Sequence, residues 1–292
     1  MSTRLTALAA AIVLPLGAGS AQMPPGMAGL RAEQGAARAA DHIIPYGKDA
    51  QQFGELRLPE GPGPFPVAVV IHGGCWVAAV DTVAGVRPLA EALRSRGIAT
   101  WSIEYRRLGN PGGGWPGTFT DVSMGVDHLS KLAKRHKLDL SRVSVVGHSA
   151  GAHLALWAAS RPRLPAPWSR VAAKPRSVAA IDGPAALAPF VGADQQVCGR
   201  PVITELMGGA PATRAAEYAL ASPAAHLPLG VDQLLVAADL GFAVKPYAAA
   251  ARAAGDTVEL LEPVGANHFD IITPGTVNGA AVADRIAAQL TR

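Results

Sequence analysis

Two kinds of hydrophobic pattern alternate along the chain. The first is a short apolar run bounded by glycine or proline, and PVAVVIH at residues 66–72 predicts a strand buried on both faces. The second has apolar residues on one helical face, as at residues 120–137, where the last turn is also basic. The predicted strands are 42–45, 52–58, 66–72, 98–104, 143–146, 177–181, 233–238 and 257–263, and the predicted helices are 85–96, 120–137, 150–161, 244–254 and 277–290.

This alternation is typical of an α/β domain with a mostly parallel central sheet and helices on both faces. In such sheets the ligand site lies in loops at the carboxyl ends of the strands. We therefore expect one α/β domain over residues 41–292, with a site built from loops that each follow a strand. Residues 187–207 show no clean periodicity, and we predict no regular element there.

The first 21 residues have the pattern of a secretory signal peptide. Arg4 precedes an apolar stretch at residues 5–16, and small residues end the segment at Ala21. The apolar stretch is short for a membrane span. We expect residues 1–21 to be cleaved on export, a secreted or periplasmic protein, and a loosely ordered lead-in over residues 22–40.

Composition and charge limit the kinds of partner that we expect the protein to bind. The chain has 292 residues, of which 49% are hydrophobic and 16% charged, so it can bury a large core. Its net charge is +4, and its densest basic stretch, residues 131–137, fits the solvated end of a helix. We expect a small-molecule partner, no nucleic acid and no stable membrane insertion, and the oligomeric state stays open.

A candidate nucleophile lies between a predicted strand and a predicted helix. The sequence GHSAG at residues 147–151 is a G-x-S-x-G motif in that setting, where glycines permit a sharp turn that exposes the serine. The helix N-terminus behind it favours negative charge. We predict that Ser149 is the nucleophile, and we interpret His148 and His153 as structural.

The loop HGGCW at residues 72–76 follows another predicted strand. Acyl transfer creates an oxyanion, which backbone N–H groups can stabilise, one of them from Ala150 and others from such a loop. Its glycines let the main chain approach Ser149. We interpret His72 as a support for the loop and not as a catalytic group.

A serine nucleophile needs a base, and His268 is the best candidate among the histidines. It follows the last predicted strand, where the chain order of a serine, an acid and a histidine would place it. We expect the acid at the end of the preceding strand, where Asp239 lies, to hold the His268 tautomer. Three other aspartates remain as alternatives: Asp182, which is one strand earlier, Asp232 and Asp270.

Together these motifs resemble the α/β-hydrolase superfamily, in particular its esterase/lipase and kynurenine formamidase-like group. The likeness covers residues 42–292 and includes Ser222-Pro223 and the HFD at residues 268–270. The resemblance implies an α/β-hydrolase fold and a serine hydrolase with no metal or organic cofactor. It also assigns the remaining oxyanion donors to the amides of Gly74 and Cys75. The stretch after Asp239 is shorter than in relatives, which is where this sequence departs from the group.

We expect hydrolysis of a carboxylic ester through an acyl-enzyme. Amide or formamide hydrolysis and peptidase activity are alternatives, as is a non-catalytic binding protein of the same fold, although such proteins usually lose the serine or the histidine. Four aromatic residues could line the pocket or belong to the core: Trp76, Tyr105, Trp115 and Phe242.

The chain has two cysteines, Cys75 and Cys198. An oxidising compartment favours a disulfide between them, and both are expected at the carboxyl edge of the sheet. We predict a bridge that fixes the oxyanion loop, with two buried thiols as the alternative.

Overall fold

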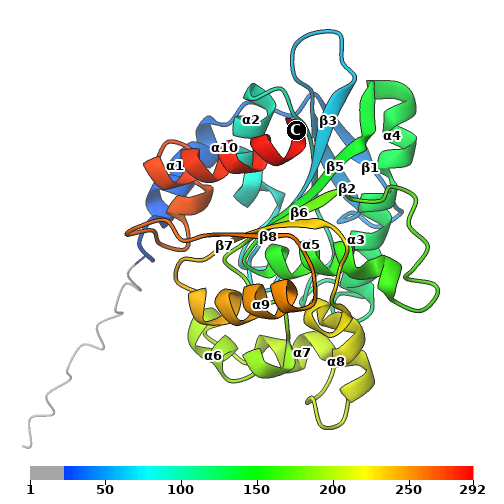
Figure 1. Ribbon diagram of the computed structural model, residues 1–292, viewed down its shortest axis with the longest axis vertical. Helices are drawn as coiled ribbons and strands as arrows, with labels where there is room; N and C mark the ends of the chain where they lie inside the picture. Colours follow the sequence, from blue (N-terminus) through cyan, green and yellow to red (C-terminus); the bar gives the residue numbers. More distant parts are fainter. Residues whose placement is uncertain (1–22, 292) are drawn as a thin grey trace, which may run out of the picture.

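The computed structural model describes residues 23–291, so the expected signal peptide lies outside the described residues. In this part of the chain, eight strands form one central sheet in the order β1-β2-β4-β3-β5-β6-β7-β8 (Figure 1). The strands β1, β2 and β4 pair antiparallel, and all other neighbours are parallel. The strand bounds are His42–Pro45 (β1), Phe53–Arg57 (β2), Phe65–Ile71 (β3), Ala99–Ile103 (β4), Leu138–His148 (β5), Ser177–Ile181 (β6), Asp232–Val236 (β7) and Val258–Leu261 (β8). The expected mostly parallel sheet is confirmed.

The sheet separates two hydrophobic cores. Along β3, Val67, Val69 and Ile71 belong to one core and Ala68 and Val70 to the other, because successive side chains of a strand point to opposite faces. On the first face lie α3 (Gly117–Asp127), α4 (Leu129–His136), α5 (Ala150–Ser160) and α9 (Gly241–Ala253), and on the second lie α1 (Met27–Ala36), α2 (Arg87–Ser95) and α10 (Val277–Thr291). Helices on both faces are confirmed as well. None of the helices within residues 23–291 has the length and apolar character to cross a membrane.

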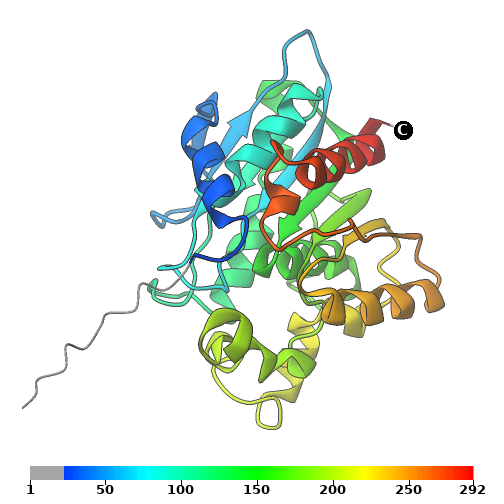
Figure 2. The same cartoon turned by 90° about the vertical axis from the view of Figure 1, so that its left-hand side faces the viewer.

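Three short helices lie beyond β6. They are α6 (Ala193–Cys198), α7 (Val202–Met207) and α8 (Ala215–Ala221), and both views show them grouped at the end of the molecule near α5 and α9 (Figures 1 and 2). The ring nitrogens of His153 and Trp157 on α5 donate to carbonyl oxygens of α8, at 2.8 and 3.0 Å. Residues 187–207, where we expect no regular element, instead contain α6 and α7. Val202 and Leu206 are buried, and the carboxylate of Asp194 accepts the N–H of Ile203 at 2.8 Å, so tertiary contacts order a segment whose local pattern is weak.

Two expectations about helices are wrong. Residues of the expected loose lead-in form α1, whose Leu30 is 2% exposed and whose Glu33 accepts the N–H of Gly275 at 2.9 Å. Contacts with distant segments thus order a stretch whose local pattern is weak. The helix expected at residues 120–137 is instead two helices, α3 and α4, separated at His128.

Candidate active site

Ser149 occupies a sharp turn between β5 and α5. Its φ of 57° is unfavourable for a residue with a side chain, at a typical cost of roughly 1–3 kcal/mol. The N–H of Ser149 donates to the carbonyl of Ile181 at 2.8 Å, which ties the turn to β6. A Cβ atom at Gly147 would lie 2.0 Å from the carbonyl oxygen of Gly151, so the turn closes only with glycine there. The chain therefore forms the strained turn that the G-x-S-x-G motif predicts.

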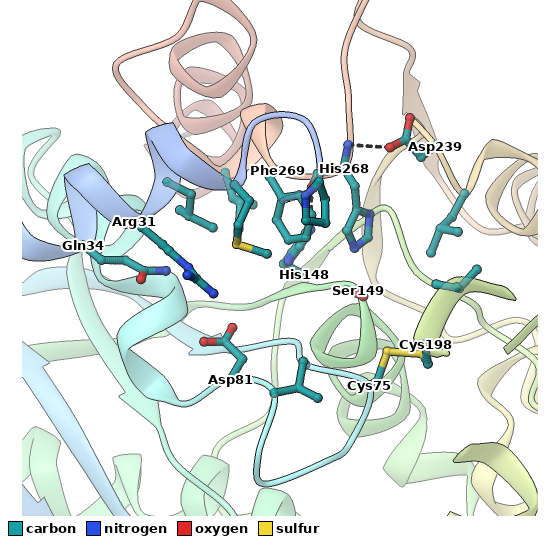
Figure 3. Close-up of a pocket in the computed structure, with 18 of the residues that line it drawn as sticks. Arg31, Gln34, Cys75, Asp81, His148, Ser149, Cys198, Asp239, His268 and Phe269 are labelled. Carbon is teal, nitrogen blue, oxygen red and sulfur yellow. Dashed lines mark hydrogen bonds between the residues drawn. A yellow bond between two sulfur atoms is a disulfide. The ribbon is translucent and has the colours of Figure 1, made fainter. Parts of the chain in front are cut away.

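The imidazole of His268 is directed toward Ser149 (Figure 3). Its Nδ1 lies 2.7 Å from Oδ2 of Asp182, whose side chain is fully buried. A carboxylate oxygen only accepts, so Nδ1 carries the proton and Nε2 is left free to accept one. The geometry thus presents an oriented base beside a serine hydroxyl.

The ring partner of His268 is Asp182, one of the alternatives, and the expectation of Asp239 is corrected. Asp239 is exposed, and its Oδ2 accepts the backbone N–H of His268 at 3.0 Å instead of contacting the ring. Asp182 directly follows β6, and its Oδ1 accepts the N–H groups of Ala238 and Leu240 at 2.8 and 3.0 Å. The short loop after β7 therefore wraps around the carboxylate of Asp182, which follows the neighbouring strand β6. Asp182 contacts the imidazole, whereas Asp239, in the loop itself, contacts only the backbone of His268.

The two remaining aspartates are elsewhere. Asp232 is exposed at the amino end of β7, away from the carboxyl edge. Asp270 accepts the N–H of Asn267 at 2.9 Å and shapes the loop that carries His268. Neither touches the imidazole.

The loop after β3 has three consecutive residues with positive φ: Gly74 (94°), Cys75 (53°) and Trp76 (55°). Two of them are not glycine, so surrounding contacts must hold this conformation. Cys75 is bridged to Cys198 with a Cα–Cα distance of 6.0 Å, and Trp76 is 1% exposed. The predicted disulfide is present, and it anchors the loop to α6.

His72 lies beneath the same loop, fully buried. Its Nε2 lies 2.9 Å from Oε1 of Glu104, and the hydroxyl of Tyr105 donates to its carbonyl at 2.8 Å. Burial opposes ionisation of Glu104, but His72 and Arg107 outweigh this effect and lower the pKa of the carboxyl. His72 thus belongs to a buried ionic network that supports the loop, in agreement with its interpretation.

His148 contacts the loop of the candidate base. Its Nε2 lies 2.8 Å from the carbonyl oxygen of His268, so it donates, and the two rings lie 4.4 Å apart. Burial, and then the neighbouring His268, lower the pKa of His148 well below its usual value. A neutral His148 is thus a fixed donor that positions His268. The sequence carried no sign of this contact beyond the proximity of His148 to Ser149.

Ser149 and His268 open into a cavity of about 490 Å³, a size suited to a small molecule. In Figure 3, Arg31 and Asp81 lie on one side of Ser149 and Cys198 lies on the other. Of the four aromatic candidates, Phe242 lines the cavity. Trp76 and Tyr105 are core residues, and Trp115 packs against the core. Within residues 23–291, no group of three or more His, Cys, Asp or Glu side chains is placed to hold a metal ion.

A family model described as BD-FAE matches residues 56–236, well over half of the chain. The chain belongs to the BD-FAE family. The matched stretch contains the loop at residues 72–76, Ser149 and Asp182. Helix α1 and His268 lie outside it, so the cavity also has walls that the family match does not cover.

Curated relatives are similar over shorter stretches. A probable isoprenylcysteine alpha-carbonyl methylesterase of Arabidopsis thaliana is 30% identical over 113 residues, which is 38% of this chain and 23% of that protein. Esterase LipQ of Mycobacterium tuberculosis is 33% identical over 132 residues, 42% of this chain and 29% of that protein. The chain spans less than a third of the length of these relatives.

Solved structures match over nearly the whole chain. Esterase B of Lactobacillus rhamnosis aligns with a TM-score of 0.75 and 19% identity, covering 91% of this chain and 92% of that one. A thermophilic esterase of Thermogutta terrifontis aligns with a TM-score of 0.68 and 18% identity, covering 89% and 95%. These likenesses establish the α/β-hydrolase fold.

Proposed function

We propose that the protein hydrolyses a carboxylic ester, with Ser149 as nucleophile, His268 as base and Asp182 as the acid that orients it. The observation that carries this proposal is the 2.7 Å contact between His268 Nδ1 and Asp182, with the ring directed toward the strained serine turn. A nucleophile, a base and a group that orients the base together define the serine-hydrolase arrangement, whatever the fold.

In the first half of the reaction, His268 Nε2 accepts the hydroxyl proton while Ser149 Oγ attacks the acyl carbon. The carbonyl oxygen becomes an oxyanion, which we assign to the amides of Gly74, Cys75 and Ala150. His268 then gives the proton to the departing alcohol oxygen, and an acyl-enzyme remains. Asp182 keeps Nδ1 protonated and stabilises the transient imidazolium.

In the second half, water takes the place of the alcohol. His268 removes a proton from it, the resulting hydroxide attacks the acyl carbon, and Ser149 leaves with the proton returned to its oxygen. No redox partner is needed, because every bond change is a proton or acyl transfer.

Relatives and neighbours support an ester substrate over an amide. The curated relatives are named as esterases, and the Thermogutta terrifontis esterase carries butyrate in its structure. A cavity of about 490 Å³ accommodates a small ester. We further propose export to an oxidising compartment, which the bridge between Cys75 and Cys198 favours.

The test is a panel of p-nitrophenyl esters and N-formylkynurenine, run on the wild type and on Ser149→Ala. We expect ester turnover that the variant lowers by more than about a thousandfold. An organophosphate should label the wild type on Ser149, as tabun and sarin do with the Thermogutta terrifontis esterase. A folded variant that keeps more than about a thousandth of the activity would remove Ser149 from the mechanism.

A further inference from the structure

A second cavity of about 300 Å³ lies beside the catalytic one. One face of α9 forms one of its walls, and the segment that follows β6, together with Ala224, forms the rest. The α9 face consists of Phe242, Ala243, Pro246, Tyr247 and Ala250. This cavity is not part of the serine, histidine and aspartate arrangement described above.

Phe242 lines both cavities. Its ring stacks on that of Phe190, with centroids 6.0 Å apart and planes 6° from parallel, yet Phe242 is 58% exposed. A side chain with this exposure changes rotamer on the picosecond to nanosecond timescale, because few neighbours oppose the motion. A movable aromatic ring therefore borders both cavities.

The chemistry of the second cavity is apolar. Its lining residues, all within the described chain, include no charged side chain, and the hydroxyl of Tyr247 already donates to Gln233 at 2.9 Å. The nearby Lys245 forms an ion pair with Glu262. A ligand here would be a hydrocarbon group, since no free polar partner is offered to it.

The catalytic cavity also has apolar surface at Phe242. Its lining includes Val197 and Phe242, which are 39% and 58% exposed. Its polar lining residues Arg31, Gln34 and Asp81 lie together on one side of Ser149 (Figure 3). An ester bound at Ser149 can therefore place its apolar part against Phe242.

We propose that the second cavity is an acyl-chain subsite, which an extended hydrocarbon acyl chain enters past Phe242. The inference rests on the proposed ester hydrolysis and adds its substrate class, esters of medium-chain carboxylic acids. Each methylene buried there raises kcat/KM by up to about fourfold, from the transfer free energy of a CH₂ group.

The experiment measures kcat/KM for p-nitrophenyl acetate, butyrate, octanoate and decanoate, and uses the decanoate-to-acetate ratio as its readout. Ala250→Phe fills the second cavity, so the ratio should fall at least about tenfold, the equivalent of two buried methylenes. Phe242→Ala removes the ring that borders both cavities, and the ratio should rise. Ala249→Phe is the matched control, because Ala249 is exposed on the same helix but does not line the cavity.

A ratio that Ala250→Phe and Ala249→Phe change equally, or not at all, overturns the subsite while leaving ester hydrolysis in place. A wild type that turns over none of the four esters overturns the proposed function, and the subsite with it. Thermal melts of each variant verify that a fall in the decanoate-to-acetate ratio does not come from unfolding.

Discussion

At the residue scale, the carboxylate of Asp182 joins three segments of the chain. It extends β6, accepts two N–H groups of the loop after β7, and accepts the ring proton of His268. Three donors around one buried carboxylate fix its orientation. The same side chain therefore serves both the folding of the loop and the orientation of the base.

Asp182→Asn and Asp239→Asn separate the two candidates for the acid. We expect Asp182→Asn to lower kcat by roughly 10³- to 10⁴-fold, because an amide no longer stabilises the imidazolium or fixes the tautomer. Asp239→Asn keeps an acceptor for the His268 N–H and should cost less than about tenfold. Steady-state kinetics on both variants measures the two losses of kcat. A larger loss in Asp239→Asn than in Asp182→Asn would restore Asp239 as the acid.

His153 makes stability depend on pH. Burial lowers its pKa to about 4, whereas a histidine in the unfolded chain titrates near 6.5. Above pH 6.5 both states hold it neutral. As the pH falls from 6.5 to 4, only the unfolded chain gains the proton, so the free energy of unfolding decreases, by about 3 kcal/mol for this group.

Urea unfolding at pH 7 and pH 4 checks this expectation against His153→Gln. Glutamine keeps a donor for the carbonyl of Ala221 but does not titrate. The decrease in unfolding free energy should therefore be smaller in the variant by about 3 kcal/mol. Equal decreases in both proteins would mean that another group dominates this pH window.

At the scale of elements, α1 stands apart because it precedes the family match and yet lines the catalytic cavity. Its residues Met27, Leu30, Arg31 and Gln34 recur at helical spacing and face that cavity. Leu30 packs into the core shared with α2 and α10, and Glu33 bonds Gly275. Helix α1 therefore forms part of the cavity wall and supplies none of the residues proposed to react.

Leu30→Ala should loosen this wall. We expect KM to rise about three- to tenfold, the equivalent of roughly 1 kcal/mol of lost contact, with a smaller change in kcat. The groups proposed to react all lie on other elements. Hydrogen exchange of α1 amides, measured beside the kinetics, should show faster exchange, and a fall in kcat alone would give α1 a different role.

At the scale of the whole molecule, the disulfide closes a span of 123 residues between the loop after β3 and helix α6. In the chain-entropy account, such a loop contributes about 5 kcal/mol to the free energy of unfolding. It also restrains Cys75, whose φ is positive. Stability and the geometry of the oxyanion loop thus depend on the same bond.

Replacing both cysteines by serine should therefore lower the melting temperature and kcat together. The serine at position 75 still offers its amide, so any loss of kcat reports loop disorder and not a missing donor. Differential scanning calorimetry and ester kinetics on the same preparation measure both. A destabilised variant with wild-type kcat would show that the loop keeps its shape without the bridge.

The sequence predicts those parts of the fold that depend on local pattern. Strand β6 is a continuous apolar run, and its bounds of 177–181 match the expectation. Ser149 follows from glycine spacing that a turn requires. Local pattern does not decide whether Asp182 or Asp239 contacts the histidine. That depends on how β6 and β7 align and on which loop closes over the other. Helix α1 escaped prediction since its order comes from contacts with residues far along the chain.

The position of Pro24 has a practical consequence for anyone who produces the protein. Pro24 lines the cavity that contains Ser149, so a tag fused directly to Met23 would begin beside that cavity. The last described element is α10, and none of its residues lines this cavity. A tag fused to Met23 would compete with substrate for the entrance. A tag at the carboxyl end leaves the entrance open, so the two tagged forms should differ in KM before they differ in anything else.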